Sequence, residues 1–230
     1  MAESSVIWFD KIGIGDVPSV GGKNASLGEM IVALSGEGIR VPTGFATTAA
    51  AYREFLEANA LEPKILGQLA AYHAGKATLQ QTGRSIRDLF LESEFPATIA
   101  EEIDAGYEEL RRRTGKADPA LAVRSSATAE DLPGASFAGQ QETFLNVRGS
   151  RALLHACRRC YASLFTDRAI SYREAKGFDH LEVALSIGVQ QMVRSDLAGS
   201  GVMFSIDTET GFPNAAVISA SWGLGELVVQ

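Results

Sequence analysis

The chain has 230 residues, 46% hydrophobic and 21% charged, which suits one large domain or two small lobes around a core. A formal net charge of −7 with no basic run excludes a broad nucleic-acid surface, although one or two local cations would suffice for a nucleotide. No apolar run reaches the ~20 residues of a membrane helix, and the start of the chain is unlike a signal or transit peptide, so we expect a cytoplasmic protein outside the membrane.

Helical patterns dominate the first half of the chain. Apolar residues recur there at three- and four-residue spacing, beside residue types that favour helix ends. Thr47 or Thr48 can cap the second helix, while Pro96 opens the fourth helix and Gly115 ends it. The predicted helices cover residues 23–34, 48–56, 85–91 and 96–114.

The second half of the chain is rich in β-forming residues around one long helical pattern. Helices followed by a mainly antiparallel sheet indicate an α+β fold. We place a mainly helical lobe at residues 1–115 and a mainly antiparallel β lobe with one long helix at residues 116–230. The predicted strands cover residues 120–123, 143–147, 183–193, 201–206 and 215–221, and the helix covers residues 151–175.

The first candidate site is a pair of glycines, Gly21 and Gly22, followed by Lys23 at the start of a predicted helix. Glycines let the backbone approach an anion, helix N–H groups point at it, and lysine adds a mobile point charge for phosphate. The segment is not a Walker A loop, because Val17 stands where the first glycine belongs and Asn24 replaces Ser or Thr. By itself the pattern fits a plain turn with an exposed lysine better than a phosphate site.

The second candidate is Arg124, which ends a predicted strand and enters a loop of Ser, Thr, Ala and Gly that runs to Gln140. Arginine can hold two phosphate oxygens at once, and such a loop can close over a triphosphate. A surface loop with a solvated arginine is about equally well supported. Glu130 and Asp131 in this loop could approach a magnesium ion, but an acidic pair in a loop is usually only solvated.

The third candidate is the apolar strand that carries Gln190, Gln191 and Met192. Its backbone could read the adenine edge while the methionine packs on the face of the base. A half-buried strand with outward glutamines explains the same pattern slightly better.

Cys157 and Cys160 have the C-x-x-C spacing of redox and zinc motifs. A structural zinc site needs a second pair of ligands, which the sequence lacks. The two cysteines also lie in a helical apolar stripe, so we expect them to be reduced and packed along a helix.

The three histidines are His73, His155 and His180. None lies beside an acidic residue in a pattern that indicates a nucleophile or a metal pair. We therefore expect surface or capping roles for all three.

Several long stretches together carry a resemblance to a known family. They are residues 20–30 (VGGKNASLGEM), 122–147 (AVRSSATAEDLPGASFAGQQETFLNV), 162–173 (ASLFTDRAISYR), 200–207 and 222–226. Almost the whole chain resembles the N-terminal region of the phosphoenolpyruvate synthase (pyruvate, water dikinase) family. Residues 195–208 (SDLAGSGVMFSIDT) favour this family over rifampin phosphotransferases and pyruvate phosphate dikinases, which share the Gly-Gly-Lys and Val-Arg-Ser patterns.

The resemblance implies an ATP-grasp fold in which two lobes hold ATP between them. The three candidate sites occur together in the family's order. The resemblance therefore favours a binding role for each of them over the purely structural explanation given above. No residue of this chain is expected to be catalytic or to bind metal. The implied ATP-binding residues are Lys23 and Arg124 for the phosphates, Gly139 and Thr143 for the nucleotide loop, Gln190 on the adenine side, and Met192 and Val193 in the hinge.

The family's reaction converts pyruvate, ATP and water to phosphoenolpyruvate, AMP and phosphate through a phosphohistidine on a swivelling domain. By resemblance, that domain, the pyruvate-binding domain and the main Mg²⁺ ligands would follow Gln230, so we expect this chain to be inactive alone. The apolar run at residues 226–230 likewise predicts that the β lobe continues. The sequence does not decide whether the complete protein is a homodimer. The alternatives are the ATP-binding front end of a rifampin phosphotransferase or pyruvate phosphate dikinase, and a non-enzymatic nucleotide-sensing or interaction module.

Overall fold

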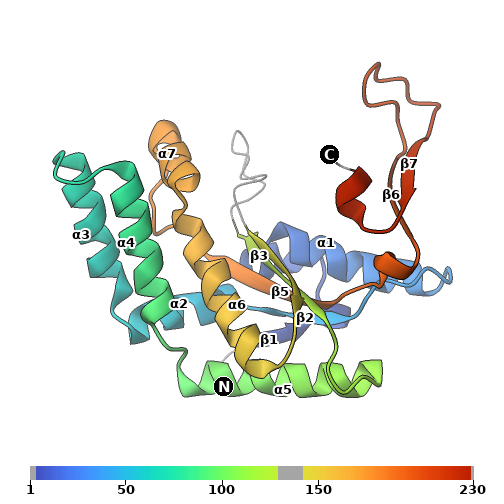
Figure 1. Ribbon diagram of the computed structural model, residues 1–230, viewed down its shortest axis with the longest axis horizontal. Helices are drawn as coiled ribbons and strands as arrows, with labels where there is room; N and C mark the ends of the chain where they lie inside the picture. Colours follow the sequence, from blue (N-terminus) through green and yellow to red (C-terminus); the bar gives the residue numbers. More distant parts are fainter. Residues whose placement is uncertain (1–3, 129–141, 229–230) are drawn as a thin grey trace. The chain divides into compact units, whose positions relative to one another are not determined.

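The computed structural model describes residues 4–128 and 142–228. The chain divides into two compact units, Met1–Met192 and Val193–Gln230 (Figure 1). Both helices and sheets are present, which confirms the mixed class expected from the sequence. No helix in the described residues is long and apolar enough to cross a membrane.

The first unit is built on a five-stranded sheet in which all neighbouring strands are antiparallel. β3 and β5 pair over seven positions, from Leu121 opposite Gln191 to Ala127 opposite Leu185. In spatial order the strands are β1 (Val6–Trp8), β2 (Gly44–Thr47), β5 (Leu185–Gln191), β3 (Leu121–Ala127) and β4 (Thr143–Val147).

The strands of this sheet can be compared with the two predicted lobes, residues 1–115 and 116–230. β1 and β2 come from before the expected boundary, and the other three strands come from after it. Both sides of the boundary therefore share one sheet, and the compact units divide at Met192 instead. β1 and β2 have three and four residues, too few to show a period in the sequence.

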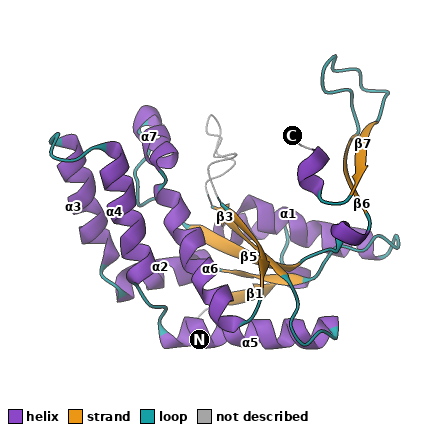
Figure 2. Cartoon of the chain, in the orientation of Figure 1, coloured by secondary structure: helices purple, strands orange, loops and turns teal. Residues whose placement is uncertain are grey.

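Helices cover both faces of the sheet (Figure 2). Val123, Ile187 and Val189 point into the main apolar core, which also takes in buried residues of α2 to α7. Ser126 and Ser186, one register position away from that set, contact α1 on the opposite face. The helices are α1 (Val17–Ser35), α2 (Ala49–Ala58), α3 (Leu61–His73), α4 (Leu79–Glu92), α5 (Ala97–Thr114), α6 (Ser150–Ala162) and α7 (Asp167–Lys176).

The predicted helix ends can be compared with these bounds. The Thr48 side chain accepts a hydrogen bond from the Ala51 N–H, which confirms the cap of α2. Pro96 and Gly115 are the N-cap and C-cap of α5, close to the expected helix ends. The single helix predicted over residues 151–175 was wrong. Extended backbone at Thr166 interrupts it, and the Thr166 hydroxyl caps a new helix, α7, by accepting from the Ala169 N–H.

The main core is dominated by stacked and edge-on aromatic rings. Tyr52, Phe55, Phe90, Tyr161 and Phe165 are all fully or almost fully buried, and neighbouring ring centroids lie 4.9–6.5 Å apart. Such rings bury more apolar area than any other side chains and supply much of the stability of a core.

The two cysteines lie in the same core. Cys157 and Cys160 are fully buried on α6 and are not joined in a disulfide, which confirms the expectation of packed, reduced thiols. Burial raises the pKa of the Cys157 thiol to about 12 and that of Cys160 well above its usual value. The thiolate is therefore disfavoured at neutral pH, as in inert structural cysteines.

The second unit is centred on an antiparallel hairpin of β6 (Gly199–Phe204) and β7 (Val217–Trp222). Met203, Ile218 and Trp222 are largely exposed on it. The predicted strands 201–206 and 215–221 are thus confirmed, with bounds that differ by one or two residues.

Candidate functional site

The glycine pair gives α1 a break where the lysine-bearing turn begins. Gly21 has φ 74° and ψ 162°, a conformation almost restricted to glycine, so the regular part of α1 begins at Gly22. A Cβ at Gly21 would lie 2.6 Å from the Ser126 carbonyl oxygen. Only glycine lets the start of this helix approach β3 so closely, and the approach places the exposed Lys23 in the first turn above the sheet.

Hydrogen bonds from Asn24 fasten this turn to the sheet. Its backbone N–H donates to the Ser126 Oγ of β3 at 3.3 Å, and its Nδ2 donates to the Ser186 Oγ of β5 at 2.9 Å. Asn24 is fully buried, whereas its neighbour Lys23 is exposed. The turn is therefore attached to β3 and β5, two adjacent inner strands of the sheet.

The strand register places Arg124 on the same face as this turn. Arg124 pairs with Gly188 of β5, two positions along from the Ser126 and Ser186 pair that contacts α1. Side chains alternate between faces along a strand, so residues two apart share a face. The two cations that the sequence singled out, Lys23 and Arg124, thus come from elements that meet on one face of the sheet.

Two other expected site residues share this face. Thr143 of β4 pairs directly with Arg124, and Gln190 of β5 pairs with Ala122, two positions before Arg124. The Gln190 Nε2 donates to the Pro42 carbonyl oxygen at 2.9 Å, which holds its side chain beside the segment before β2.

The remaining expected residues are placed differently. The Met192 N–H donates to the Ala120 carbonyl at 2.9 Å, and the Asn146 N–H lies 3.0 Å from the Met192 sulfur. Val193 is exposed and begins the second unit. Gly139 lies outside the described residues, as do Glu130 and Asp131 in the same loop.

A cluster of ionisable residues on α3, α7 and the segment after α7 escaped the sequence reasoning. The Glu174 Oε1 lies 2.9 Å from the His73 Nε2 and 2.7 Å from the His180 Nε2. The fully buried Arg173 donates its Nε to the His180 Nδ1 at 3.0 Å. His73 is exposed at the end of α3, as the expected surface role requires. His180 is mostly buried between Arg173 and Glu174, so the prediction was wrong for His180. His73 and Glu174 are 101 positions apart, which no local pattern reveals.

Burial and hydrogen bonds shift the pKa values of three residues in this cluster. Burial lowers the pKa of the Arg173 guanidinium to about 10 and also lowers the pKa of His180. Hydrogen bonds from His180 and His73 lower the pKa of the Glu174 carboxyl. Because the His180 Nδ1 accepts from Arg173, the ring is held neutral with its proton on Nε2.

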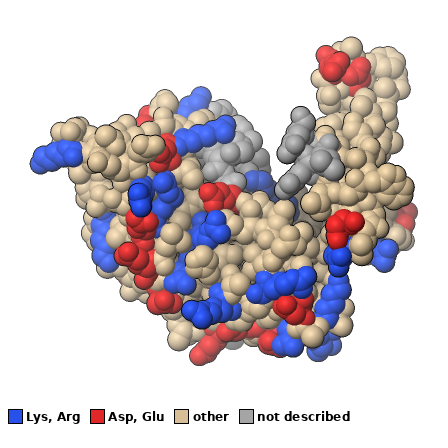
Figure 3. Space-filling view, in the orientation of Figure 1, with Lys and Arg blue, Asp and Glu red and all other residues tan. Residues whose placement is uncertain are grey.

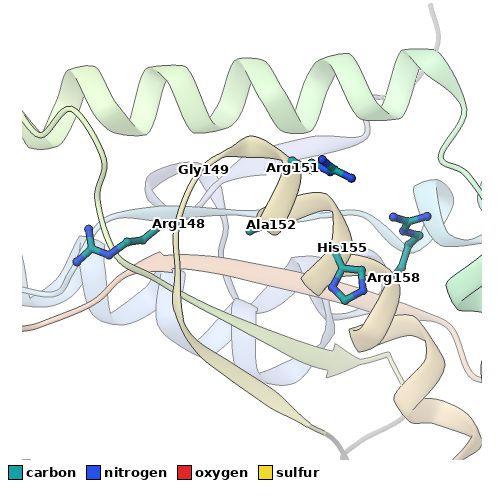
Figure 4. Close-up of a pocket in the computed structure, with 6 residues that line it drawn as sticks. All are labelled: Arg148, Gly149, Arg151, Ala152, His155 and Arg158. Carbon is teal, nitrogen blue, oxygen red and sulfur yellow. The ribbon is translucent and has the colours of Figure 1, made fainter.

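A basic cavity adjoins α6, on the side of the sheet opposite α1. It has a volume of about 480 Å³. Figure 4 shows Arg148 pointing away from Arg151 and Arg158, so the charges do not converge on one point. In Figure 3, Lys and Arg side chains in this area are interspersed with acidic ones. The lining residues are Arg148, Gly149, Arg151, Ala152, His155 and Arg158.

A second cavity, of about 510 Å³, follows the edge strand β4 and includes Thr143. The Arg159 guanidinium lies over the Phe144 ring there, 4.1 Å from its centroid. Among the described residues, no three His, Cys, Asp or Glu side chains are grouped so that they could hold a metal ion.

Comparison with known proteins defines the class to which this site belongs. Residues 17–230 match the family described as "Pyruvate phosphate dikinase, AMP/ATP-binding domain", and the chain belongs to this family. It is similar to the phosphoenolpyruvate synthase of Synechocystis sp., with 56% identity over 98% of this chain and 28% of the relative.

Two further relatives carry the same name. The phosphoenolpyruvate synthase of Neisseria meningitidis serogroup B is 54% identical over 100% of this chain and 29% of the relative. That of Escherichia coli is 54% identical over 98% of this chain and 28% of the relative. The chain therefore spans less than a third of the length of the curated relatives it matches.

Proposed function

We propose that this chain is the N-terminal ATP-binding part of a phosphoenolpyruvate synthase, which converts pyruvate, ATP and water to phosphoenolpyruvate, AMP and phosphate. The observation that carries the proposal is the meeting of the Lys23 turn with the Arg124 strand on one face of the sheet. The relatives named above and the long motifs of the sequence support the synthase over the related phosphotransferases.

The two cations have complementary tasks in this proposal. Arg124 presents a planar fork that can hold two phosphate oxygens, and Lys23 supplies a mobile charge for a third. Phosphoryl transfer depends mainly on positioning and charge neutralisation, so holding the triphosphate is itself a catalytic contribution. We assign Gln190 to the adenine side, and Thr143 and Gly139 to the segment that covers the nucleotide.

An ATP-grasp arrangement would complete the site with a second lobe. Met192 and Val193 lie at the boundary of the two compact units, which agrees with a hinge role there. The phosphohistidine and pyruvate-binding domains would lie in other parts of the polypeptide. We expect this chain alone to turn over no pyruvate.

Magnesium does not fit the described residues, since no three of their His, Cys, Asp or Glu side chains are placed so that they could hold a metal ion. We therefore assign no step to a metal held by this part of the chain. Its ligands belong to a later segment in this proposal, and ATP binding by the isolated chain should be weaker than in the complete protein.

The test is a titration of the complete polypeptide with ATP, followed by thermal stability and by calorimetry. ATP should raise the Tm, because a ligand that binds only the folded state stabilises it by mass action. Lys23→Ala and Arg124→Ala should each weaken ATP binding roughly 10- to 100-fold, the loss expected for one charge-assisted hydrogen bond. Lys76→Ala, at an exposed position after α3, is the matched control.

Two results would remove the proposal. If the complete wild-type protein showed no ATP-dependent shift, its nucleotide role would be wrong. If both cation variants bound ATP as the wild type does, the site would lie elsewhere.

A further inference from the structure

Asn24 contacts β3 and β5, two adjacent inner strands of the sheet, from the helix that carries Lys23. Its exposed fraction is 0%, and its backbone and side chain bond to Ser126 and Ser186. Neither bond is within α1. The residue that follows the proposed phosphate lysine therefore points away from solvent and into the sheet.

The orientation of the Asn24 amide follows from its partner. The Ser186 Oγ donates its one proton to the Thr47 carbonyl oxygen at 2.5 Å, so it must accept from the Asn24 Nδ2. This turns the Asn24 Oδ1 towards β5. That oxygen is buried and has no hydrogen-bond partner among the described residues.

The Oδ1 lies against Gly188, the residue of β5 that pairs with Arg124. A Cβ at Gly188 would lie 3.3 Å from the Asn24 Cγ and closer still to Oδ1. One side chain thus joins the turn that carries Lys23 to the strand position opposite Arg124.

We infer that Asn24 is a positioning residue that fixes the Lys23 ammonium relative to the Arg124 guanidinium, an inference that rests on the proposed function. Two cations can hold one polyphosphate only if their separation matches it, and small displacements of such groups are costly. An apolar side chain could pack in the same place without burying an oxygen that lacks a partner. The buried amide, with its oxygen unpartnered among the described residues, therefore points to a requirement for a fixed orientation.

The first experiment compares Asn24→Ala with wild type in the complete polypeptide, with calorimetric affinities for ATP and for adenosine. A displaced Lys23 should weaken ATP binding roughly tenfold, because one charge-assisted contact is impaired. Adenosine carries no phosphate, so its affinity should be unchanged. A purely structural role would change both affinities alike or neither.

Ser163→Ala is the matched control. Ser163 is also buried, and its Oγ donates to the Cys160 carbonyl oxygen at 2.7 Å, at the end of α6. This variant loses a buried hydrogen bond of the same kind without touching α1. It should leave the ratio of the ATP and adenosine affinities unchanged.

The second experiment uses the contact with Gly188. Gly188→Ala forces Asn24 away from β5 and should also weaken ATP binding selectively. In the Asn24→Ala background the obstructing atoms are gone, so the same change should have little further effect. If Asn24→Ala does not fold, Ser186→Ala, which removes the amide's acceptor together with the hydroxyl's bond to the Thr47 carbonyl, replaces it in the first comparison.

The outcomes separate this inference from the proposed function. Selective loss of ATP affinity together with non-additive variants supports it. If Lys23→Ala weakens ATP binding but Asn24→Ala or Ser186→Ala does not, or if the losses simply add, the inference is wrong and the proposed function stands. If wild type itself fails to bind ATP, both fail.

Discussion

The two faces of the same sheet differ in chemistry. Towards α2–α7, β3 and β5 present Val123, Ile187 and Val189 to a core of aromatic rings. Towards α1 they present Ser126 and Ser186, together with arginine, glycine and glutamine. The apolar face gains free energy from burial, whereas the polar face satisfies its groups through specific hydrogen bonds and close backbone contacts. Under the proposed function, stability and nucleotide binding thus belong to opposite faces of one sheet.

Phe90→Ala on the apolar face should give the largest effect. Phe90 is fully buried, and its ring lies 5.5 Å from that of Phe165 and 6.1 Å from that of Phe55. Truncating a buried phenylalanine typically costs about 3–5 kcal/mol, through lost transfer energy and the cavity left behind. Urea denaturation should show this loss, while calorimetry on the folded fraction should show unchanged ATP affinity. A large affinity change would contradict the division of roles between the faces.

Gly21→Ala on the polar face should give the next largest effect. The backbone strain alone is worth about 1–3 kcal/mol, and the added Cβ would meet Ser126. Both stability and ATP affinity should fall, because the turn that carries Lys23 must move away from β3. Thermal denaturation and an ATP titration measure the two effects.

Gly67→Ala provides the control for this prediction. Gly67 lies inside α3, with open space where its Cβ would be, so alanine should stabilise the protein by about 1 kcal/mol. A loss of stability in Gly21→Ala together with a gain in Gly67→Ala would show that the cost at Gly21 comes from its backbone conformation and its contact with Ser126. Equal tolerance at both would show that the close approach of α1 to β3 is not required.

Much of the polar face could be predicted because its chemistry is carried by residue type. A lysine after two glycines and an arginine at the end of a strand stood out in the sequence, and the structure places their segments together. Asn24 was read only as a departure from the Walker A pattern. Its partners Ser126 and Ser186 lie 102 and 162 positions away, so only the folded chain reveals its role.

Secondary structure was also predicted well only where the signal is local in sequence. Helices with caps and periodic apolar residues, such as α5, were predicted closely. β1 and β2 were missed because short strands owe their existence to pairing partners distant in sequence. The break at Thr166 was missed because apolar residues continue at helical spacing through both α6 and α7.

The smallest expected effect is a pH dependence of stability that arises at His180, on the side of the sheet covered by α2–α7. The charged and titratable groups around it are Arg173, Glu174, Asp179 and, through Glu174, His73. Burial lowers the pKa of His180 in the folded state, so the unfolded chain binds a proton first as the pH falls. Stability from this group is therefore present above the unfolded value of about 6.5 and is lost as the pH falls below it.

His180→Gln should remove this dependence, because glutamine can accept from Arg173 and donate to Glu174 without titrating. The difference in Tm between pH 7 and pH 5 should be smaller in the variant than in wild type. The lowered pKa of Glu174 places its own loss of stability below about pH 4.5, outside this window, and His73 is present in both proteins. His155→Gln, at an exposed position of α6, is the control for the substitution itself. An unchanged difference in Tm between pH 7 and pH 5 in His180→Gln would mean that protonation of His180 does not cause the pH dependence of stability.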